Sequence, residues 1–336
     1  MNNKFLIIFI SMLLFFYQWA TAQSINQTVQ TALDNNESLK SQKKLVDNSY
    51  QNFLIQSGKL LPNLSLNLNG NRSSNFDTNK ETDSYSISLN SSFMLFDFGS
   101  LNAKKKSAQQ LNDASKLSFS KLENELILSV SKVHLELFKA IKIVELYENS
   151  LEVRKQQFLA VKNRFDLGEA TKSDLLRSKA SISGAEAQLK VGQANVKKFR
   201  EGYKTLVGRV PQTPKLPQTI MKEPSLLETS IRAAVKNDLG LKILMLEEQA
   251  LKEELRSTEK SRYPNLSVSG ALSYGDSQTL GSNSSSGRIS LTSNLTLYSG
   301  GQKKAQVKIA SNNLAAKAID IAVRKKMLER DVTTKW

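Results

Sequence analysis

The sequence predicts an α+β fold in which long coiled-coil helices alternate with two β-hairpins. One helix–strand–strand–helix pattern occurs twice, with equivalent residues 202 positions apart. Each copy contains two segments in which apolar and polar residues alternate, as they do in strands with two different faces. The stretch from Leu101 to Arg164 has neither Pro nor Gly and carries apolar residues at coiled-coil spacing. With 336 residues, 40% of them hydrophobic, the chain can build a packed core.

The N-terminus has the features of a secretory signal. Lys4 precedes an apolar run from Phe5 to Phe16, and the small-residue triplet Ala20-Thr21-Ala22 follows. We expect residues 1–22 to be a cleaved signal peptide, because the apolar run is too short to span a bilayer. The sequence contains no cysteine, which excludes disulfides, thiolate metal ligands and a lipid on the first mature residue, Gln23. The mature protein is thus expected to be exported and not to be a lipoprotein.

The duplication divides the mature chain. Leu61-Pro62-Asn63-Leu64 has its counterpart in Tyr263-Pro264-Asn265-Leu266, and the same offset relates Gly99 to Gly301 without any insertion. The repeat therefore predicts three segments: a first repeat at 23–209, a Pro-rich linker at 210–224, and a second repeat at 225–336.

Each repeat is expected to begin with a helix that leads into a hairpin. Residues 24–59 have helical spacing and end just before Pro62. Pro62 and its counterpart Pro264 mark where the chain enters the strands. The alternation then predicts β-hairpins, with strands of about ten residues, at 64–97 and 265–298. Between the strands, two segments rich in Ser, Asn, Gly and Asp are expected to be exposed loops, at 71–83 and 276–287.

The composition of the alternating segments indicates a membrane β-barrel. Their polar positions are almost all Ser, Thr or Asn, and aromatic residues lie near the strand ends at Phe93, Phe96, Tyr274 and Tyr298. The alternative is an ordinary hairpin that packs one face on a soluble core. Four strands cannot close a membrane barrel, and an open sheet edge cannot face lipid, so the chain must oligomerise. A dimer, trimer or tetramer would supply eight, twelve or sixteen strands.

A long helical hairpin is predicted after the first pair of strands. Apolar residues recur at intervals of three, four and seven in the first helix, and small and apolar residues at intervals of three and four in the second, which is the spacing of a coiled-coil seam. At ~1.5 Å per residue, about sixty residues make a rod of ~90 Å. The tip of the hairpin is placed near residues 165–173, where Gly168 can end one helix and Thr171 or Ser173 can cap the next.

Catalysis, cofactors and nucleic acid are not predicted. One histidine and no cysteine leave no metal cluster and no His-activated nucleophile, and no phosphate-binding glycine loop is present. His134 is expected at a solvated or seam position of the long helix. The net charge of +16 would suit nucleic acid, but the basic residues alternate with Glu along the helices, and the chain is exported. Asp166, Glu169 and Asp174 are interpreted as capping or exposed charges.

The order of these motifs resembles the TolC family of outer-membrane factors. The features that carry the resemblance are the duplicated Leu/Tyr-Pro-Asn-Leu strand starts, the strand ends Phe96-Asp97-Phe98-Gly99 and Tyr298-Ser299-Gly300-Gly301, and the tip Arg164-Phe165-Asp166-Leu167-Gly168 with Asp174-Leu175-Leu176. The resemblance implies a homotrimer whose four strands per protomer form a twelve-stranded barrel in the lipid of the outer membrane. It also implies an α-helical tunnel in the periplasm.

The same resemblance implies partners and a site. A periplasmic adaptor (membrane fusion) protein and an inner-membrane ABC or proton-driven transporter would complete a passive export channel for type I protein secretion or multidrug efflux. The adaptor would dock on the hairpin tip, at Arg164, Asp166, Leu167, Gly168, Glu169, Thr171, Ser173 and Asp174. Two alternatives remain open at this point: a trimeric coiled-coil surface adhesin or scaffold, and a soluble periplasmic helical protein.

The second repeat is shorter than the first. Trp336 is the counterpart of His134, so the counterpart of the helical hairpin is missing. In the family that region supplies half of the tunnel wall and much of the periplasmic aperture. We therefore interpret the sequence as C-terminally truncated and expect that a chain ending here does not assemble a working channel.

Overall fold

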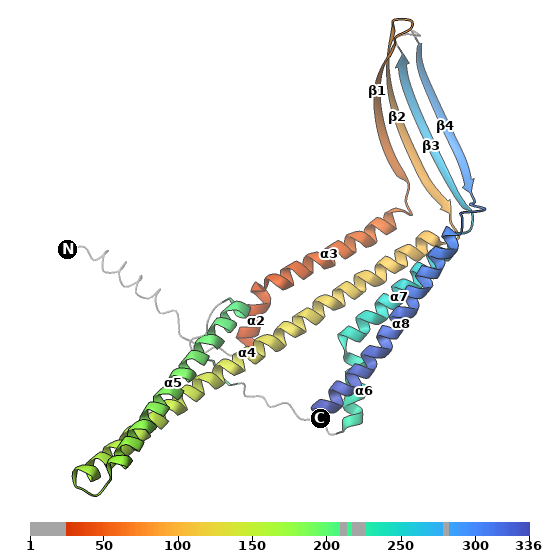
Figure 1. The fold of residues 1–336 in the computed structure, drawn as a ribbon. Helices are drawn as coiled ribbons and strands as arrows, with labels where there is room; N and C mark the ends of the chain where they lie inside the picture. Colours follow the sequence, from red (N-terminus) through yellow and green to blue (C-terminus); the bar gives the residue numbers. More distant parts are fainter. Residues whose placement is uncertain (1–24, 209–213, 217–225, 278–281) are drawn as a thin grey trace, which may run out of the picture. The chain divides into compact units, whose positions relative to one another are not determined.

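The computed structural model describes residues 25–208, 214–216, 226–277 and 282–336 (Figure 1). The expected signal peptide and most of the linker at 210–224 lie outside the described residues. The elements are α2 (Ile25–Asn35), α3 (Glu37–Gly58), β1 (Asn63–Asn75), β2 (Lys80–Phe96), α4 (Ser100–Asp166), α5 (Lys172–Val207), α6 (Leu227–Asn237), α7 (Leu239–Lys260), β3 (Asn265–Ser277), β4 (Ser282–Asn294) and α8 (Gln302–Lys335). None of the helices in the described ranges is long and apolar enough to cross a membrane.

Two compact units divide the chain differently from the two repeats. The first comprises Met1–Lys40 and Leu122–Glu223, and the second comprises Ser41–Lys121 and Pro224–Trp336. The second unit thus takes residues from both sides of the predicted linker, whereas the first takes none that follow it, and α3 and α4 run through both units. The predicted division into a first repeat, a linker and a second repeat is based on the sequence alone and stays a prediction.

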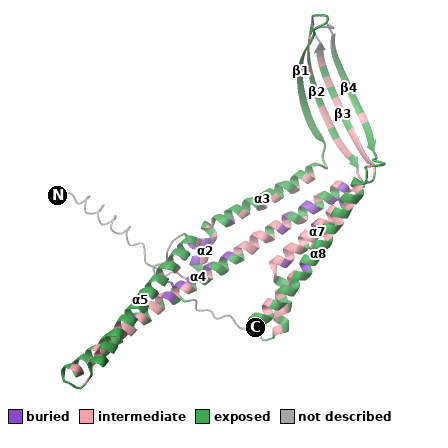
Figure 2. Ribbon diagram, viewed as in Figure 1, coloured by how far each residue is buried: buried purple, intermediate pink, exposed green. Residues whose placement is uncertain are grey.

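The first unit is built on the α4–α5 hairpin, with α2 packed beside α5 (Figure 1). The predicted seam is the buried side of this hairpin: Leu126, Val130 and Leu137 of α4 and Ala185, Gly192 and Tyr203 of α5 are all buried (Figure 2). At Gly192 a β-carbon would lie 2.9 Å from Cδ2 of Tyr147 and 3.2 Å from Cγ2 of Val144. The small residue therefore allows the close approach of the two helices.

A buried polar cluster joins three segments of the first unit. The Thr28 hydroxyl lies 2.8 Å from the Tyr203 hydroxyl and 3.3 Å from Nδ1 of His134. Nε2 of His134 lies 3.0 Å from the carbonyl oxygen of Lys215. Thr28, His134 and Tyr203 are each 0% exposed. His134 therefore occupies a hydrogen-bonded core position, and a solvated position is excluded.

In the second unit, α6 and α7 pack against α8. Arg324 of α8 donates to both carboxylate oxygens of Asp238, at 3.1 and 2.8 Å, and Lys317 donates to Glu247 at 3.0 Å. Burial acts to raise the pKa of Asp238, but hydrogen bonds from Arg324 and from the Leu241 amide outweigh it and hold that pKa below its usual range. These pairs link α8 to the two helices that precede β3.

The prediction of one continuous helix at 24–59 was wrong. The helix is interrupted at Asn36, whose side chain accepts a hydrogen bond from the Leu39 amide at 3.1 Å. The second repeat is interrupted at the equivalent position, Asp238, whose carboxylate accepts from the Leu241 amide at 2.6 Å. In both repeats a short polar side chain caps the second helix and ends the first.

The second unit also contains one antiparallel four-stranded sheet in the order β1-β2-β3-β4. The strands have 13, 17, 13 and 13 residues and are longer than predicted. Most of the segment 71–83 is therefore strand, and only 76–79 forms the turn; likewise 282–287 belongs to β4, while 278–281 lies outside the described residues. The predicted extension of the second hairpin to residue 298 was wrong, since β4 ends at Asn294.

Candidate functional site

One face of the sheet is apolar, although none of the described residues covers it. Leu66, Leu89 and Leu272 are directly opposite one another on β1, β2 and β3, so they share a face. The same register brings these side chains onto that face: Leu64, Leu68, Tyr85, Ile87, Phe93, Val268, Tyr274, Ile289 and Leu291. Ile289 is 85% exposed and Leu64 is 67% exposed. A contiguous apolar face of this kind requires lipid or a partner.

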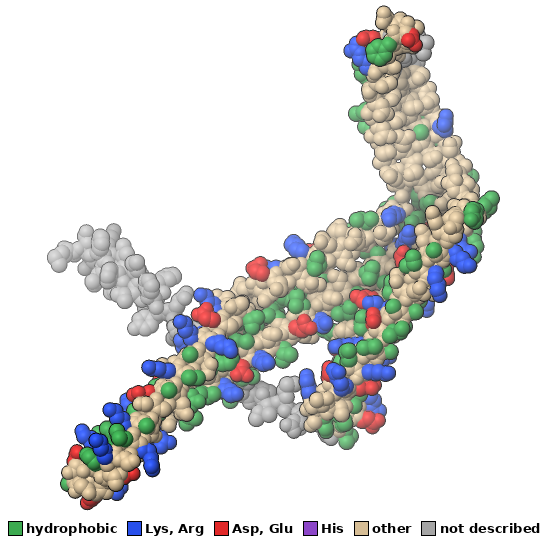
Figure 3. Space-filling view, viewed as in Figure 1, with side chains coloured by type: hydrophobic (Ala, Val, Ile, Leu, Met, Phe, Trp, Pro, Cys, Tyr) green, Lys and Arg blue, Asp and Glu red, His purple; other side chains and the backbone are tan. Residues whose placement is uncertain are grey.

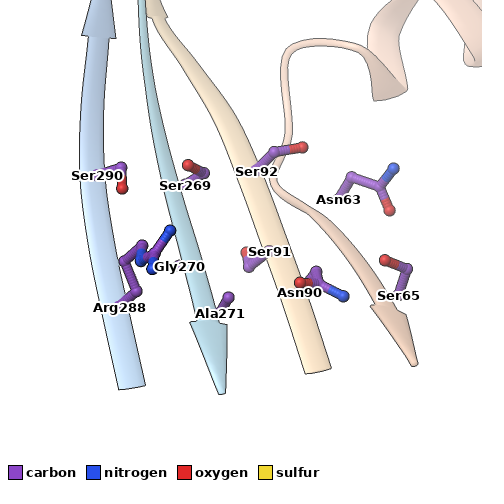
Figure 4. A pocket seen from close by; sticks show the side chains of 10 residues that line it. All are labelled: Asn63, Ser65, Asn90, Ser91, Ser92, Ser269, Gly270, Ala271, Arg288 and Ser290. Atoms are coloured by element: carbon purple, nitrogen blue, oxygen red, sulfur yellow. The ribbon is translucent and has the colours of Figure 1, made fainter. Parts of the chain in front are cut away.

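The opposite face is polar across all four strands. Its residues are Ser65, Asn67, Asn69, Ser84, Ser86, Ser88, Asn90, Ser92, Ser269, Ala271, Ser273, Ser286, Arg288, Ser290 and Thr292, with a few further positions of the same kind. Among its described side chains Arg288 is the only charged one, and none is acidic. Figure 4 shows Arg288 extending from β4 toward β3, beside Gly270 and among Ser and Asn side chains. The sheet thus separates an apolar side from a hydrophilic, nearly uncharged side.

Aromatic side chains lie near both ends of the apolar face. At the end next to the helices, the rings of Phe96 and Tyr263 flank Phe98, with centroid distances of 4.8 and 4.9 Å. Tyr85 and Tyr274 lie toward the turns, at 58% and 49% exposure. Rings in these positions are typical of the two interfaces of a membrane.

The two prolines expected at the strand starts directly precede strands. Pro62 comes just before β1 and Pro264 just before β3. A proline has no backbone N–H, so the position before the first paired residue is one of the few that tolerates it. After β2, the Asp97 carboxylate accepts hydrogen bonds from the amides of Gly99 and Leu101, at 2.9 and 2.5 Å, and begins α4.

The hairpin tip is a capped turn. Gly168 has φ +78°, and its amide donates to the Phe165 carbonyl, while the Glu169 amide donates to the Arg164 carbonyl. Thr171 is the cap of α5: its hydroxyl accepts from the Asp174 amide at 3.2 Å, and its own amide donates to the Asp174 carboxylate at 3.1 Å.

The predicted tip residues are brought together on this turn, and all of them are exposed: Arg164, Asp166, Leu167, Gly168, Glu169, Thr171, Ser173 and Asp174. Hydrogen bonds from the hydroxyl and the amide of Thr171 hold the pKa of Asp174 below its usual range, and Arg177 and Arg164 add to the effect. Leu167 is 76% exposed, so the tip offers an apolar side chain to solvent beside charged ones.

A groove of about 590 Å³ between α4 and α5 lies next to the tip. It is lined by Arg154, Gln157, Ala160, Val161, Arg164, Ala170, Asp174, Arg177, Ser178 and Ser181. Three arginines and one carboxylate give it a positive balance, and Figure 3 shows Lys and Arg side chains gathered toward this end of the hairpin. Sequence analysis missed Arg154 and Arg177. Arg177 follows Asp174 by three residues on α5, which was the available signal for it, whereas the packing of α4 on α5 places Arg154 in the groove.

Within the described ranges, no group of three or more His, Cys, Asp or Glu side chains could hold a metal ion. The candidate functional surfaces are the two faces of the sheet and the hairpin tip.

The sequence is similar to outer-membrane proteins of Gram-negative bacteria. It is 22% identical over 323 residues to the outer membrane efflux protein BepC of Brucella suis, covering 95% of this chain and 70% of that protein. It is 21% identical over 326 residues to the outer membrane protein TolC of Vibrio cholerae, covering 93% of this chain and 73% of that protein. The chain thus spans about seven tenths of the length of these two relatives.

The fold is that of solved outer-membrane channels. CusC superimposes with a TM-score of 0.83 at 16% identity, over 93% of this chain and 74% of that one. The open state of the MtrE outer membrane channel of Neisseria gonorrhoeae gives a TM-score of 0.76 at 20% identity, over 92% and 70%. The expected TolC-like α+β fold is therefore confirmed. The family described as outer membrane efflux protein matches residues 28–209, more than half of the sequence. The chain therefore belongs to the outer membrane efflux protein family.

Proposed function

We propose that the chain is one protomer of a homotrimeric outer-membrane channel. The sheet of each protomer forms part of one continuous barrel, and the hairpin tip of each protomer binds an adaptor protein. Membership of the family makes it an outer-membrane component of a tripartite export system with a periplasmic extension. The adhesin and the soluble periplasmic protein are not favoured. The compared proteins are channels and efflux proteins rather than enzymes.

The observation that carries this proposal is the two-faced sheet. An exposed apolar face opposite a Ser- and Asn-rich face suits lipid on one side and water on the other. Tyr85 and Phe96 are eleven residues apart on β2, so at the usual strand tilt they span ~28 Å of membrane thickness. This is close to the ~25 Å apolar band of outer-membrane barrels. In this arrangement lipid contacts Leu66, Leu89 and Leu272.

The sheet edges require further copies of the chain. β1 and β4 each pair on one side only, which leaves two long edges. In lipid each unpaired N–H or C=O group costs several kcal/mol, so an open edge is excluded there. Joining β4 of one copy to β1 of the next keeps the strands antiparallel and closes a ring by rotation. Three copies give the twelve strands that the resemblance to the TolC family implies.

The hairpin tip is the proposed adaptor site. Its Gly168 turn is rigidly capped by Thr171 and Asp174, yet every predicted docking residue is exposed. The adjoining arginine-lined groove favours a partner segment with acidic side chains. The partner would be a periplasmic adaptor that couples the channel to an inner-membrane ABC or proton-driven transporter.

Disulfide trapping tests the proposed ring. The chain has no cysteine, so a Ser65→Cys exchange on β1, combined in turn with Cys at Ser286, Ser290 or Thr292 of β4, reports only designed contacts. In the full-length protein, including any residues that follow Trp336, we expect one combination to yield a ladder up to the trimer on non-reducing gels of outer membranes. Replacing Ser65→Cys by Ser88→Cys on the inner strand β2 is the matched control and should give no ladder. Failure of every combination in outer-membrane protein would contradict the ring.

Photo-crosslinking tests the tip. A photoreactive side chain at Glu169 should capture the periplasmic adaptor, whereas the same group at the exposed Lys197 of α5 should capture little. Equal capture at both positions, or none at Glu169, would remove the docking role from the tip.

A further inference from the structure

Arg288 occupies the middle of the polar face. Across the sheet it shares one register row with Ala271, Asn90 and Ser65, six residues from each end of β4. Its side chain is exposed and lies over β3 (Figure 4). A guanidinium stays charged at every relevant pH, so this position carries a permanent positive charge.

No counter-charge accompanies Arg288. The hollow around it, of about 200 Å³, is lined by Asn63, Ser65, Asn90, Ser91, Ser92, Ser269, Gly270, Ala271, Arg288 and Ser290, without any carboxylate. Among the described residues, Arg288 forms no ion pair. Arg72 belongs to the rows of the apolar face, near the turn between β1 and β2. Unlike Arg288, it forms an ion pair with Glu81, and its Nε lies 3.6 Å from a carboxylate oxygen of Asp83. Of the two arginines in the strands, Arg288 is the one without an ion pair to another residue that the structure describes.

The surroundings of Arg288 favour an oxyanion. The Ser hydroxyls and Asn amides beside it can donate hydrogen bonds to the same anion that the planar guanidinium fork binds. If this face lines a lumen, symmetry repeats the charge at one height in every protomer, which makes a ring of arginines. Rings of Arg or Lys are one way in which pores prefer anions, and a narrow low-dielectric wall focuses their field.

We propose that Arg288 is a specificity-determining residue of the channel, which attracts small anions and the carboxylate or phosphate groups of cargo into the barrel. The inference rests on the proposed function, since it requires the polar face to surround the lumen. It goes beyond that function by naming the charge class of what passes and the residue that selects it.

Reversal potentials in planar bilayers test the role of Arg288. The full-length protein, including any residues that follow Trp336, is purified from outer membranes and measured under a KCl gradient. Its chloride-to-potassium permeability ratio is compared with that of Arg288→Gln in the same full-length protein. We expect the ratio to fall by about twofold, the effect of a few screened charges some 10 Å from the ion path. Arg288→Lys should keep the wild-type ratio. Arg72→Gln removes the same charge from the opposite face and should leave the ratio unchanged.

Each result has a separate meaning. An unchanged ratio in Arg288→Gln, or an equal change in Arg72→Gln, would overturn the role of Arg288 while leaving the channel intact. Absence of any conductance in the wild-type protein would contradict the proposed function instead. Should Arg288→Gln fail to assemble, Ser290→Glu places a carboxylate two residues along the same strand and face. That variant should lower the ratio by neutralising the ring, and an unchanged ratio there would again overturn the inference.

Discussion

Hydrogen bonds in the buried polar cluster of the first unit have a consistent set of directions when Nε2 of His134 carries the ring proton. The Lys215 carbonyl can only accept, so Nε2 of a neutral His134 donates to it and Nδ1 must accept. The Thr28 hydroxyl then donates to Nδ1 and accepts from the Tyr203 hydroxyl. Through these bonds α2, α4, α5 and the segment at 214–216 are held at one point of the core. The histidine acts as a structural residue that satisfies two buried partners.

Removing one hydroxyl from this cluster should destabilise the first unit. Tyr203→Phe leaves Thr28 with one hydrogen bond fewer, and we expect the free energy of unfolding to fall by about 1 kcal/mol. Chemical denaturation in detergent, followed by circular dichroism, measures the change. Tyr147→Phe is the matched control, because the Tyr147 hydroxyl bonds to no other described residue, and it should change stability little. An equal loss in the two variants would contradict the role of the cluster.

The cap of α5 should weaken in acid. The pKa of Asp174 is depressed in the folded chain, so the stabilisation is present above the ordinary carboxyl pKa and is lost as pH falls through the lower, folded value. Hydrogen exchange at the first turn of α5, corrected for intrinsic rates, should therefore accelerate as the pH falls below about 4, the ordinary carboxyl pKa. In Asp174→Asn this pH dependence should disappear. A pH dependence that persists in Asp174→Asn would mean that another group controls the turn.

At the scale of an element, the seam of the α4–α5 hairpin depends on Gly192. Gly192→Ala would place a β-carbon against the Tyr147 ring, so the helices must separate, and we expect a loss of about 1–3 kcal/mol in the free energy of unfolding. Gly184, in the same helix, has no neighbour within 4 Å of a β-carbon position. Gly184→Ala should instead stabilise the helix by about 0.5–1 kcal/mol. Changes of the same sign in the two variants would contradict the close approach at Gly192.

The helical hairpin and the strands could be predicted because periodic side-chain patterns dictate them. The interruptions at Asn36 and Asp238 were missed because apolar spacing continues on both sides of them. The signal for the interruptions was local. At both positions a short polar side chain lies three residues before a Leu, and it can accept a hydrogen bond from the backbone amide of that Leu. The strands were predicted too short because Ser and Asn residues next to a turn are equally common in a loop and on the hydrophilic face of a strand. Only the pairing with the neighbouring strand decides which of the two these residues form.

The tip of the hairpin was predictable from residue types, but its groove was not. Gly168 and Thr171 belong to helix-ending and helix-starting patterns that need only local sequence. The approach of Arg154 to Arg177 depends on which faces of α4 and α5 meet, and this follows from the packing of the whole hairpin. The buried state of His134 likewise depends on Thr28 and Tyr203, which lie 106 and 69 positions away along the chain.

At the scale of the whole molecule, the sheet makes the chain dependent on its surroundings. Its apolar face has no cover within the described residues, and β1 and β4 have open edges. In water such a sheet would aggregate through both features. In the proposed channel a membrane would cover the face and neighbouring copies would pair the edges, so insertion and assembly would satisfy requirements that the isolated sheet leaves unmet. The polar face would then surround the water that fills the lumen.

This assignment of the two faces predicts opposite effects for neighbouring substitutions on β2. Leu89→Arg would place a charge against lipid, at a cost of about 2–4 kcal/mol in each protomer near the bilayer centre, and should strongly reduce the amount of assembled protein in the outer membrane. Ser88→Arg introduces the same side chain one residue away on the water-filled side and should be tolerated. Sucrose-gradient fractionation and quantitative blotting measure both. Loss of assembled protein in Ser88→Arg with normal levels in Leu89→Arg would reverse the assignment of the faces and, with it, the direction in which Arg288 points.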